Sequence, residues 1–408
     1  MDPLAAFVLA ILLVALLTVK TGLSPFLSLL VASLVYGLLL GMGPDLIGYM
    51  TAGLARIFSA LAIIVFSGSV IAEHLRRSGG EDRVVSDLLS LVGRKRGSLA
   101  SGLSGYIVAL PAMCSITSYM ILEPVVREMG RKAGGHERRF LFSAAVFSII
   151  SFNLVYPSPV LVTLTGSLAV SPAEALKFGL PLSFLLFAPV LLWLSRFPVV
   201  GVAPPIEEGP APSRLVSWAP LILPLAMILL GVLHPAAWLV GSPDVALLSG
   251  ALLSAALAKK EAGDMIKRAT RRAGTIIFDL CGAGAFGYVV AQGGIGPELY
   301  ATLGPVVPVV LLPFLAASLI QLAQGSRVVT VVIAAEMMRG YPLEPVTLLF
   351  LISAGAFALS SFSDPYFWLV KETTGSDLKE ALLWYTLPLT LCGLLVFAAA
   401  ALRWHLLI

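Results

Sequence analysis

Long apolar segments separated by short polar loops are the feature that most constrains this chain, and they follow one another along nearly all of its 408 residues. A helix needs about 20 apolar residues to cross a hydrocarbon core roughly 30 Å thick. Only 12% of the residues are charged, whereas a soluble domain carries about 25%. The sequence therefore predicts an all-α polytopic membrane protein and excludes a soluble enzyme.

The chain divides near its middle at residues 196–215, a linker rich in Pro, Gly and Glu that we expect on the cytoplasmic side. Short windows on its two sides match: Phe66–Glu73 resembles Ala285–Gln292, and other matches follow in the same order. Matches in a constant order indicate an internal repeat, which is common among transporters. We expect two repeats, at 1–195 and 216–408.

Loop charge predicts the orientation of these repeats. Residues 74–97 and 127–139 are both strongly basic, and basic loops stay in the cytoplasm. The apolar segment between them, about 98–126, must then enter and leave by one face as a re-entrant hairpin. A second hairpin at about 306–338 has few basic residues around it and is expected to open to the outside.

Five full spans and one hairpin in each half make the two repeats inverted, because five is odd. The predicted topology has about ten transmembrane helices in the cell membrane, with the basic loops inside and both termini outside. Two of the spans, about 140–170 and about 346–371, contain proline-rich breaks. In inverted-repeat transporters, such discontinuous helices point their N-termini at an anionic substrate.

We expect the substrate site where the breaks and hairpin tips meet. The candidate substrate-binding residues carry hydroxyl, amide or guanidinium groups or a flexible backbone: Ser115, Thr117, Asn153, Ser158, Gln324, Gly325, Ser326, Arg327 and Ser363. Arg327 can form a bidentate pair with a carboxylate. The alternatives are a kinked helix whose Arg327 reaches a lipid headgroup and, for the neutral groups, simple hydrogen bonding between helices.

Two acidic residues, Asp279 and Asp364, are candidates for binding the coupling ion. A carboxylate at membrane depth is paired with a cation or binds a proton. Asp364 can alternatively cap a half-helix, and Asp279 can be a stabilising ion-pair partner of Arg327. The sequence contains no nucleotide-binding or metalloprotease motif, and its three cysteines form no metal-binding pattern. We therefore expect no cofactor, no metal and no nucleic-acid partner.

Motifs in both halves resemble the gluconate permease family of the ion transporter superfamily. They are Ser78-Gly-Gly80, Gly93-Arg-Lys-Arg96, Gly105-Tyr-Ile-Val-Ala-Leu-Pro111, Gly282-Ala-Gly-Ala-Phe-Gly287, Gly294-Ile-Gly296, Ala323-Gln-Gly-Ser326 and Phe367-Trp-Leu-Val-Lys-Glu372. The resemblance implies a proton-coupled carrier of gluconate and related sugar acids, paired hairpins, a homodimer and elevator-like movement. Ser115 stands where the family has an acidic residue, and Arg327 replaces a small one.

These observations lead to one main hypothesis, a proton-driven symporter of a small organic anion such as gluconate or another hydroxy or sugar carboxylate. A sodium/proton or other cation antiporter of the same superfamily is the first alternative, with Asp279 and Asp364 as its cation site. A non-transporting membrane scaffold or integral enzyme is the second.

Overall fold

The computed structural model describes residues 2–92, 96–196, 212–361 and 363–407. Every regular element among these residues is a helix, which confirms the all-α prediction. Most of the expected linker, residues 197–211, lies outside the described residues.

The helices of the first half are α1 (Pro3–Thr21), α2 (Pro25–Leu39), α3 (Asp45–Ser78), α4 (Gly80–Val92), α5 (Gly97–Ala109), α6 (Ser115–Lys132), α7 (Glu137–Leu154), α8 (Pro159–Leu168), α9 (Pro172–Leu185) and α10 (Phe187–Ser195). Those of the second half are α11 (Arg214–Leu233), α12 (Pro243–Ala258), α13 (Ala262–Gln292), α14 (Ile295–Leu303), α15 (Leu311–Gln324), α16 (Arg327–Met337), α17 (Pro345–Phe357), α18 (Pro365–Thr374), α19 (Leu378–Ala381) and α20 (Leu387–Leu407). A π-helical turn, Leu382–Thr386, joins α19 to α20.

Several segments can cross a bilayer. Among the described residues, six helical segments are long and apolar enough for this by length and composition. Large apolar side chains such as Leu38, Leu185 and Leu192 are exposed on the outer faces; lipid covers such surfaces in a membrane protein. The chain is a multi-pass membrane protein.

Proline positions many of the helix starts. It occupies the first helical turn of α2, α8, α9, α17 and α18, among others, where its missing N–H costs no hydrogen bond. The same residue type stops the preceding segment, because the ring clashes with a continuing helix. Pro157 and Pro159 thus end α7 and start α8, and Pro365 starts α18 after the break that follows α17.

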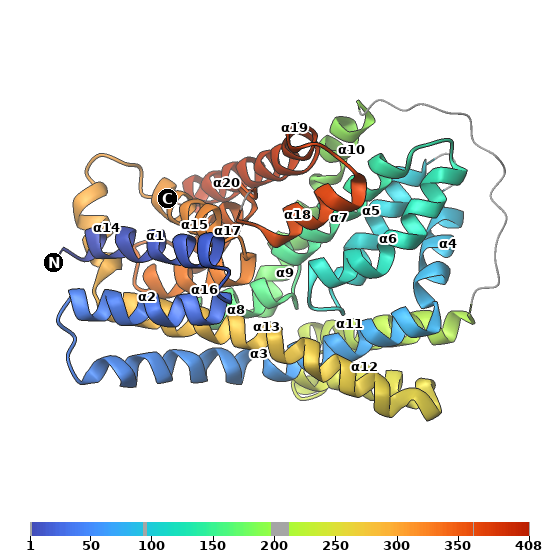
Figure 1. Ribbon diagram of the computed structural model, residues 1–408, viewed down its shortest axis with the longest axis horizontal. Helices are drawn as coiled ribbons and strands as arrows, with labels where there is room; N and C mark the ends of the chain where they lie inside the picture. The colour runs from blue at the N-terminus through green and yellow to red at the C-terminus, as the bar shows by residue number, and fades with distance from the viewer. Residues whose placement is uncertain (1, 93–95, 197–211, 362, 408) are drawn as a thin grey trace.

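The two longest helices, α3 and α13, pack against each other along one side of the molecule (Figure 1). Gly53 and Gly284 allow this contact, since a Cβ on Gly53 would lie 2.3 Å from the carbonyl oxygen of Gly284. Small residues permit such close backbone approach between membrane helices. On the other side of this pair, α16 packs against α13 and α8 packs against α3.

Helices α7 and α17 are buried along almost their whole length. Every residue from Phe140 to Leu154 and from Val346 to Phe357 is buried. Both helices end at a break, and each break is followed by a short helix, α8 or α18. The two helix pairs α5–α6 and α15–α16 lie beside them, so two turns and two breaks are brought into the interior.

Candidate functional site

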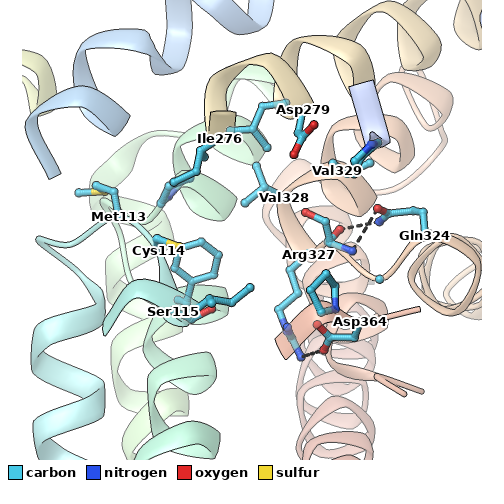
Figure 2. A pocket seen from close by; sticks show the side chains of 18 residues that line it. Met113, Cys114, Ser115, Ile276, Asp279, Gln324, Arg327, Val328, Val329 and Asp364 are labelled. Carbon is cyan, nitrogen blue, oxygen red and sulfur yellow. Dashed lines mark hydrogen bonds and ion pairs between the residues drawn. The ribbon is translucent and has the colours of Figure 1, made fainter. Parts of the chain in front are cut away.

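A cavity of about 200 Å³ lies where the two helix pairs meet the two breaks. Met113–Ile116, at the turn between α5 and α6, line one side, and Gln324–Val329, at the turn between α15 and α16, line the other. Figure 2 shows these turns facing each other, with Asp279 of α13 between them at the upper edge. We call the two turns the first tip (110–116) and the second tip (324–329).

Five helices begin at this cavity: α2, α6, α8, α16 and α18 each contribute a first-turn or capping residue to its lining. The first amides of a helix have no acceptor within the helix, and the aligned peptide dipoles give that end a partial positive charge. Helix N-termini bind anions for this reason. The cavity is therefore favourable for an anionic group even before side chains are considered.

The first tip is shaped by Cys114, which precedes α6 in an extended conformation and accepts a hydrogen bond from the N–H of Thr117 at 3.4 Å through its sulfur. Ser115 lines the cavity. Thr117 is buried within α6 and does not belong to the lining. The structure thus brings one of the two predicted hydroxyl residues of this tip to the site.

The second tip depends on Gly325, whose φ of 80° is left-handed and favours glycine. A Cβ at this position would lie 2.0 Å from the carbonyl oxygen of Ser363. Gln324 closes the tip, because its Nε2 donates to the carbonyl of Ser326 at 2.5 Å and its Oε1 accepts from the Ser326 N–H at 3.0 Å. Although Gln324 and Ser326 both line the cavity, the Gln324 amide is engaged within its own turn.

Arg327 forms a buried ion pair with Asp364, with Nη2 3.1 Å from Oδ2 and side chains 4% and 1% exposed. Nη2 also donates to Ser360 Oγ at 2.8 Å, while the Tyr385 hydroxyl donates to Asp364 Oδ2 at 3.1 Å. The sequence alternative that paired Arg327 with Asp279 is wrong. The first turn of α16 directs Arg327 toward the break before α18, away from α13 (Figure 2).

Asp364 is also the N-cap of α18, since its Oδ1 accepts from the Tyr366 N–H at 2.8 Å. Capping and charge pairing are thus combined in one carboxylate. Sequence reasoning missed Tyr385 and Ser360. Tyr385 lies in the π-helical turn, a feature often found at functional sites, but no local pattern in an apolar segment signals such a turn.

Asp279 lines the cavity from α13 and accepts a hydrogen bond from the N–H of Phe26, at the start of α2, at 3.2 Å. No cationic side chain among the described residues forms an ion pair with it. It is therefore the one cavity carboxylate without a charged partner in the described part of the chain.

Three other predicted residues lie outside the lining. Asn153 is fully buried at the end of α7; its carbonyl accepts from Ser353 Oγ, and its side-chain amide has no partner within the described residues. Ser158 caps α8 by accepting from the Leu161 N–H. Ser363 donates to the Leu322 carbonyl at 2.6 Å and fastens the break to the end of α15.

Comparison with known proteins identifies the family of this chain. The model of the GntP family permeases matches residues 3–191 and 205–406. The chain belongs to the GntP permease family. This GntP permease is 26% identical to a low-affinity gluconate transporter of Escherichia coli K12, over 94% of each chain. It is 23% identical to the D-serine transporter DsdX of the same strain, again over 94% of each chain.

Among solved structures, this GntP permease resembles the YdaH transporter of Alcanivorax borkumensis, with a TM-score of 0.65 and 18% identity over 88% of this chain and 90% of that one. The likeness concerns the fold. The relatives are transporters and permeases, so this member of the family is a membrane permease and not an enzyme.

Proposed function

We propose that this permease is a secondary active transporter of a small organic anion, such as gluconate or another hydroxy or sugar carboxylate, driven by a proton gradient. The observation that carries the proposal is a cavity enclosed by two facing tips and five helix N-termini. Gluconate transporters among the relatives support the substrate class. D-serine, the substrate named for another relative, also carries a carboxylate.

The substrate carboxylate is bound by first-turn amides of α6 and α16 and by the hydroxyls of Ser115 and Ser326, which line opposite sides of the cavity. Arg327 contributes positive charge while Asp364 holds it in place. Gln324 and Gly325 shape the second tip. Ser158 and Ser363 fix the elements that carry the site, and Thr117 and Asn153 are buried outside the lining. The coupling ion binds at Asp279 or Asp364.

The proposed architecture has two inverted repeats with about ten crossings and two re-entrant hairpins. Helices occur in the same order in both halves: two helices, a long helix, a short helix, a tip-forming pair and a broken helix. In Figure 1 both termini lie toward one end of the long axis, and α4 and the start of α13, which carry basic residues, lie toward the other. This separation supports a cytoplasmic basic end and termini outside. Elevator-type movement in a homodimer is part of the proposal through the resemblance to the superfamily.

Uptake of labelled gluconate and D-serine into liposomes containing the purified protein tests the proposal, with and without proton and sodium gradients. Ser115→Ala and Ser326→Ala should each raise KM about tenfold, since a hydrogen bond to a charged group is worth about 1.5–3 kcal/mol. Ser249→Ala is the matched control, because Ser249 bonds only its own helix in the described contacts. Unchanged KM in both tip variants would contradict the site.

Failure to transport any tested carboxylate would contradict the substrate class. Sodium-dependent dissipation of a pH gradient without an organic substrate would instead support the cation antiporter. The two outcomes are measured in the same vesicles, with the pH inside reported by a trapped fluorescent dye.

A further inference from the structure

The charged groups around the cavity do not balance. Among the described residues, the lining contains one basic side chain, Arg327, and two carboxylic acids, Asp364 and Asp279. The first two form a buried ion pair, so their formal charges cancel. Asp279, which has no charged partner in the described structure, leaves the lining with one net negative charge when it is ionised.

This charge faces the place where an anion would bind. Asp279 lines the same cavity as the two tips (Figure 2). Its Oδ1 accepts a hydrogen bond from the Phe26 N–H, which is the one side-chain hydrogen bond of Asp279 among the described residues. A carboxylate substrate therefore meets helix N-termini on the tips and a like charge on α13. Binding a proton at Asp279 removes the repulsion.

Two other titratable groups on helices packed against α13 have partners of their own. On α3, Arg56 is 3.7 Å from Glu336 of α16 and lies over the Tyr288 ring of α13. On α2, the Tyr36 hydroxyl donates to the Val290 carbonyl.

The remaining titratable or charged groups on the elements packed against α13 and on the first tip are Asp45, Tyr49, Glu73, His74, Arg76, Arg77, Cys114, Asp244, Lys259, Lys260, Glu261, Glu298 and Tyr300. Of these, only Cys114 belongs to the described cavity lining.

Asp279 and the anion-binding groups belong to different helices. Asp279 belongs to α13, which is joined to α3 through the Gly53–Gly284 contact. Arg327 and Asp364 belong to the second tip and to α18. A proton on Asp279 and an anion on the tips therefore bind to separate groups of one cavity.

We infer that Asp279, and not Asp364, binds the coupling proton of this transporter. Asp364 is unsuited to release and bind a proton in each cycle, because it caps α18, pairs with Arg327 and accepts from Tyr385. Anion binding and proton binding at Asp279 favour each other, and this coupling is reciprocal. The inference rests on the proposed function.

The test uses the full chain in liposomes with labelled gluconate. Asp279→Asn keeps an oxygen acceptor for the Phe26 N–H, but its amide does not gain or lose a proton as the pH changes. Proton-driven accumulation should fall about tenfold or more, and the gluconate exchange that remains should no longer vary between about pH 5.5 and pH 8. Asp264→Asn, an exposed change on the same helix, is the matched control and should accumulate gluconate like the wild type.

A binding measurement provides the second readout. Calorimetry in buffers of different ionisation enthalpy should show about one proton taken up with each gluconate by the wild type, and about none by Asp279→Asn. Asp279→Glu should restore proton uptake.

Two results would overturn the assignment of Asp279 alone: accumulation by Asp279→Asn at the wild-type level, or loss of proton uptake only in Asp364→Asn. Accumulation that follows sodium instead of pH would contradict the proton-driven function, and this inference with it. A wild type that neither binds nor accumulates carboxylates would contradict the proposed function, and this inference with it.

Discussion

Removal of either member of the Arg327–Asp364 pair should destabilise the protein, by amounts that the surrounding contacts determine. Breaking a buried ion pair from one side costs about 3–5 kcal/mol, because it leaves a buried charge uncompensated. After Asp364→Ala, the Arg327 guanidinium keeps the hydroxyls of Ser360 and Tyr385, and α18 loses a cap worth about 1 kcal/mol. We expect a loss of about 4–6 kcal/mol.

Arg327→Ala should cost less. The Asp364 carboxylate then keeps two donors, the Tyr385 hydroxyl and the Tyr366 N–H, and hydrogen bonds to a charged group are worth about 1.5–3 kcal/mol each. We expect a loss of about 2–3 kcal/mol. The double variant should lose about 2–3 kcal/mol less than the sum of the single variants, since neither charge is then left unpaired.

The assay is equilibrium unfolding in mixed detergent micelles, followed by tryptophan fluorescence. Its control is the same cycle on Lys132 and Glu128, an ion pair 3.6 Å apart with side chains 35% and 55% exposed, where the coupling should stay below about 1 kcal/mol. A coupling energy at Arg327–Asp364 no larger than at the exposed pair would refute the reasoning.

Three further predictions concern the tips and α4. Gly325→Ala should abolish gluconate uptake, because the added Cβ would lie 2.0 Å from the Ser363 carbonyl oxygen at a φ of 80°; uptake within about threefold of wild type would contradict this geometry. Cys114 lines the cavity, so bound gluconate should slow its alkylation by a maleimide about tenfold, measured by mass spectrometry; equal rates would place the anion elsewhere. Burial raises the pKa of Glu81, on α4, from an ordinary value near 4.5 to about 7. The folded state therefore binds the proton more tightly, and its stability should fall as pH rises between these values. Glu81→Gln should remove that fall and give a higher melting temperature than the wild type above pH 7, with no advantage below pH 4.5; a melting temperature equally pH-dependent in both proteins would contradict it.

A feature of the site can be predicted from the sequence when it depends only on residues that are neighbours along the chain. The breaks around Asn153–Pro159 and Ser360–Pro365 could be predicted, since proline stops a helix through its own ring and missing N–H. The tip at Gly325 could be predicted for a similar reason. The engagement of Gln324 within its own turn was not foreseen, because an amide donates equally well to a neighbour or to a ligand.

The sequence by itself determined that this chain spans a membrane many times and where its helices are interrupted, because hydrophobicity and helix breaking are properties of short segments. Which charged side chains form ion pairs was decided by the tertiary structure alone. Arg327 pairs with Asp364 because of the relative rotation of α16 and α18, and Tyr385 reaches both from a π-helical turn. Asp279 meets Phe26 across 253 positions of sequence, which leaves it as the unpaired acid in the described cavity.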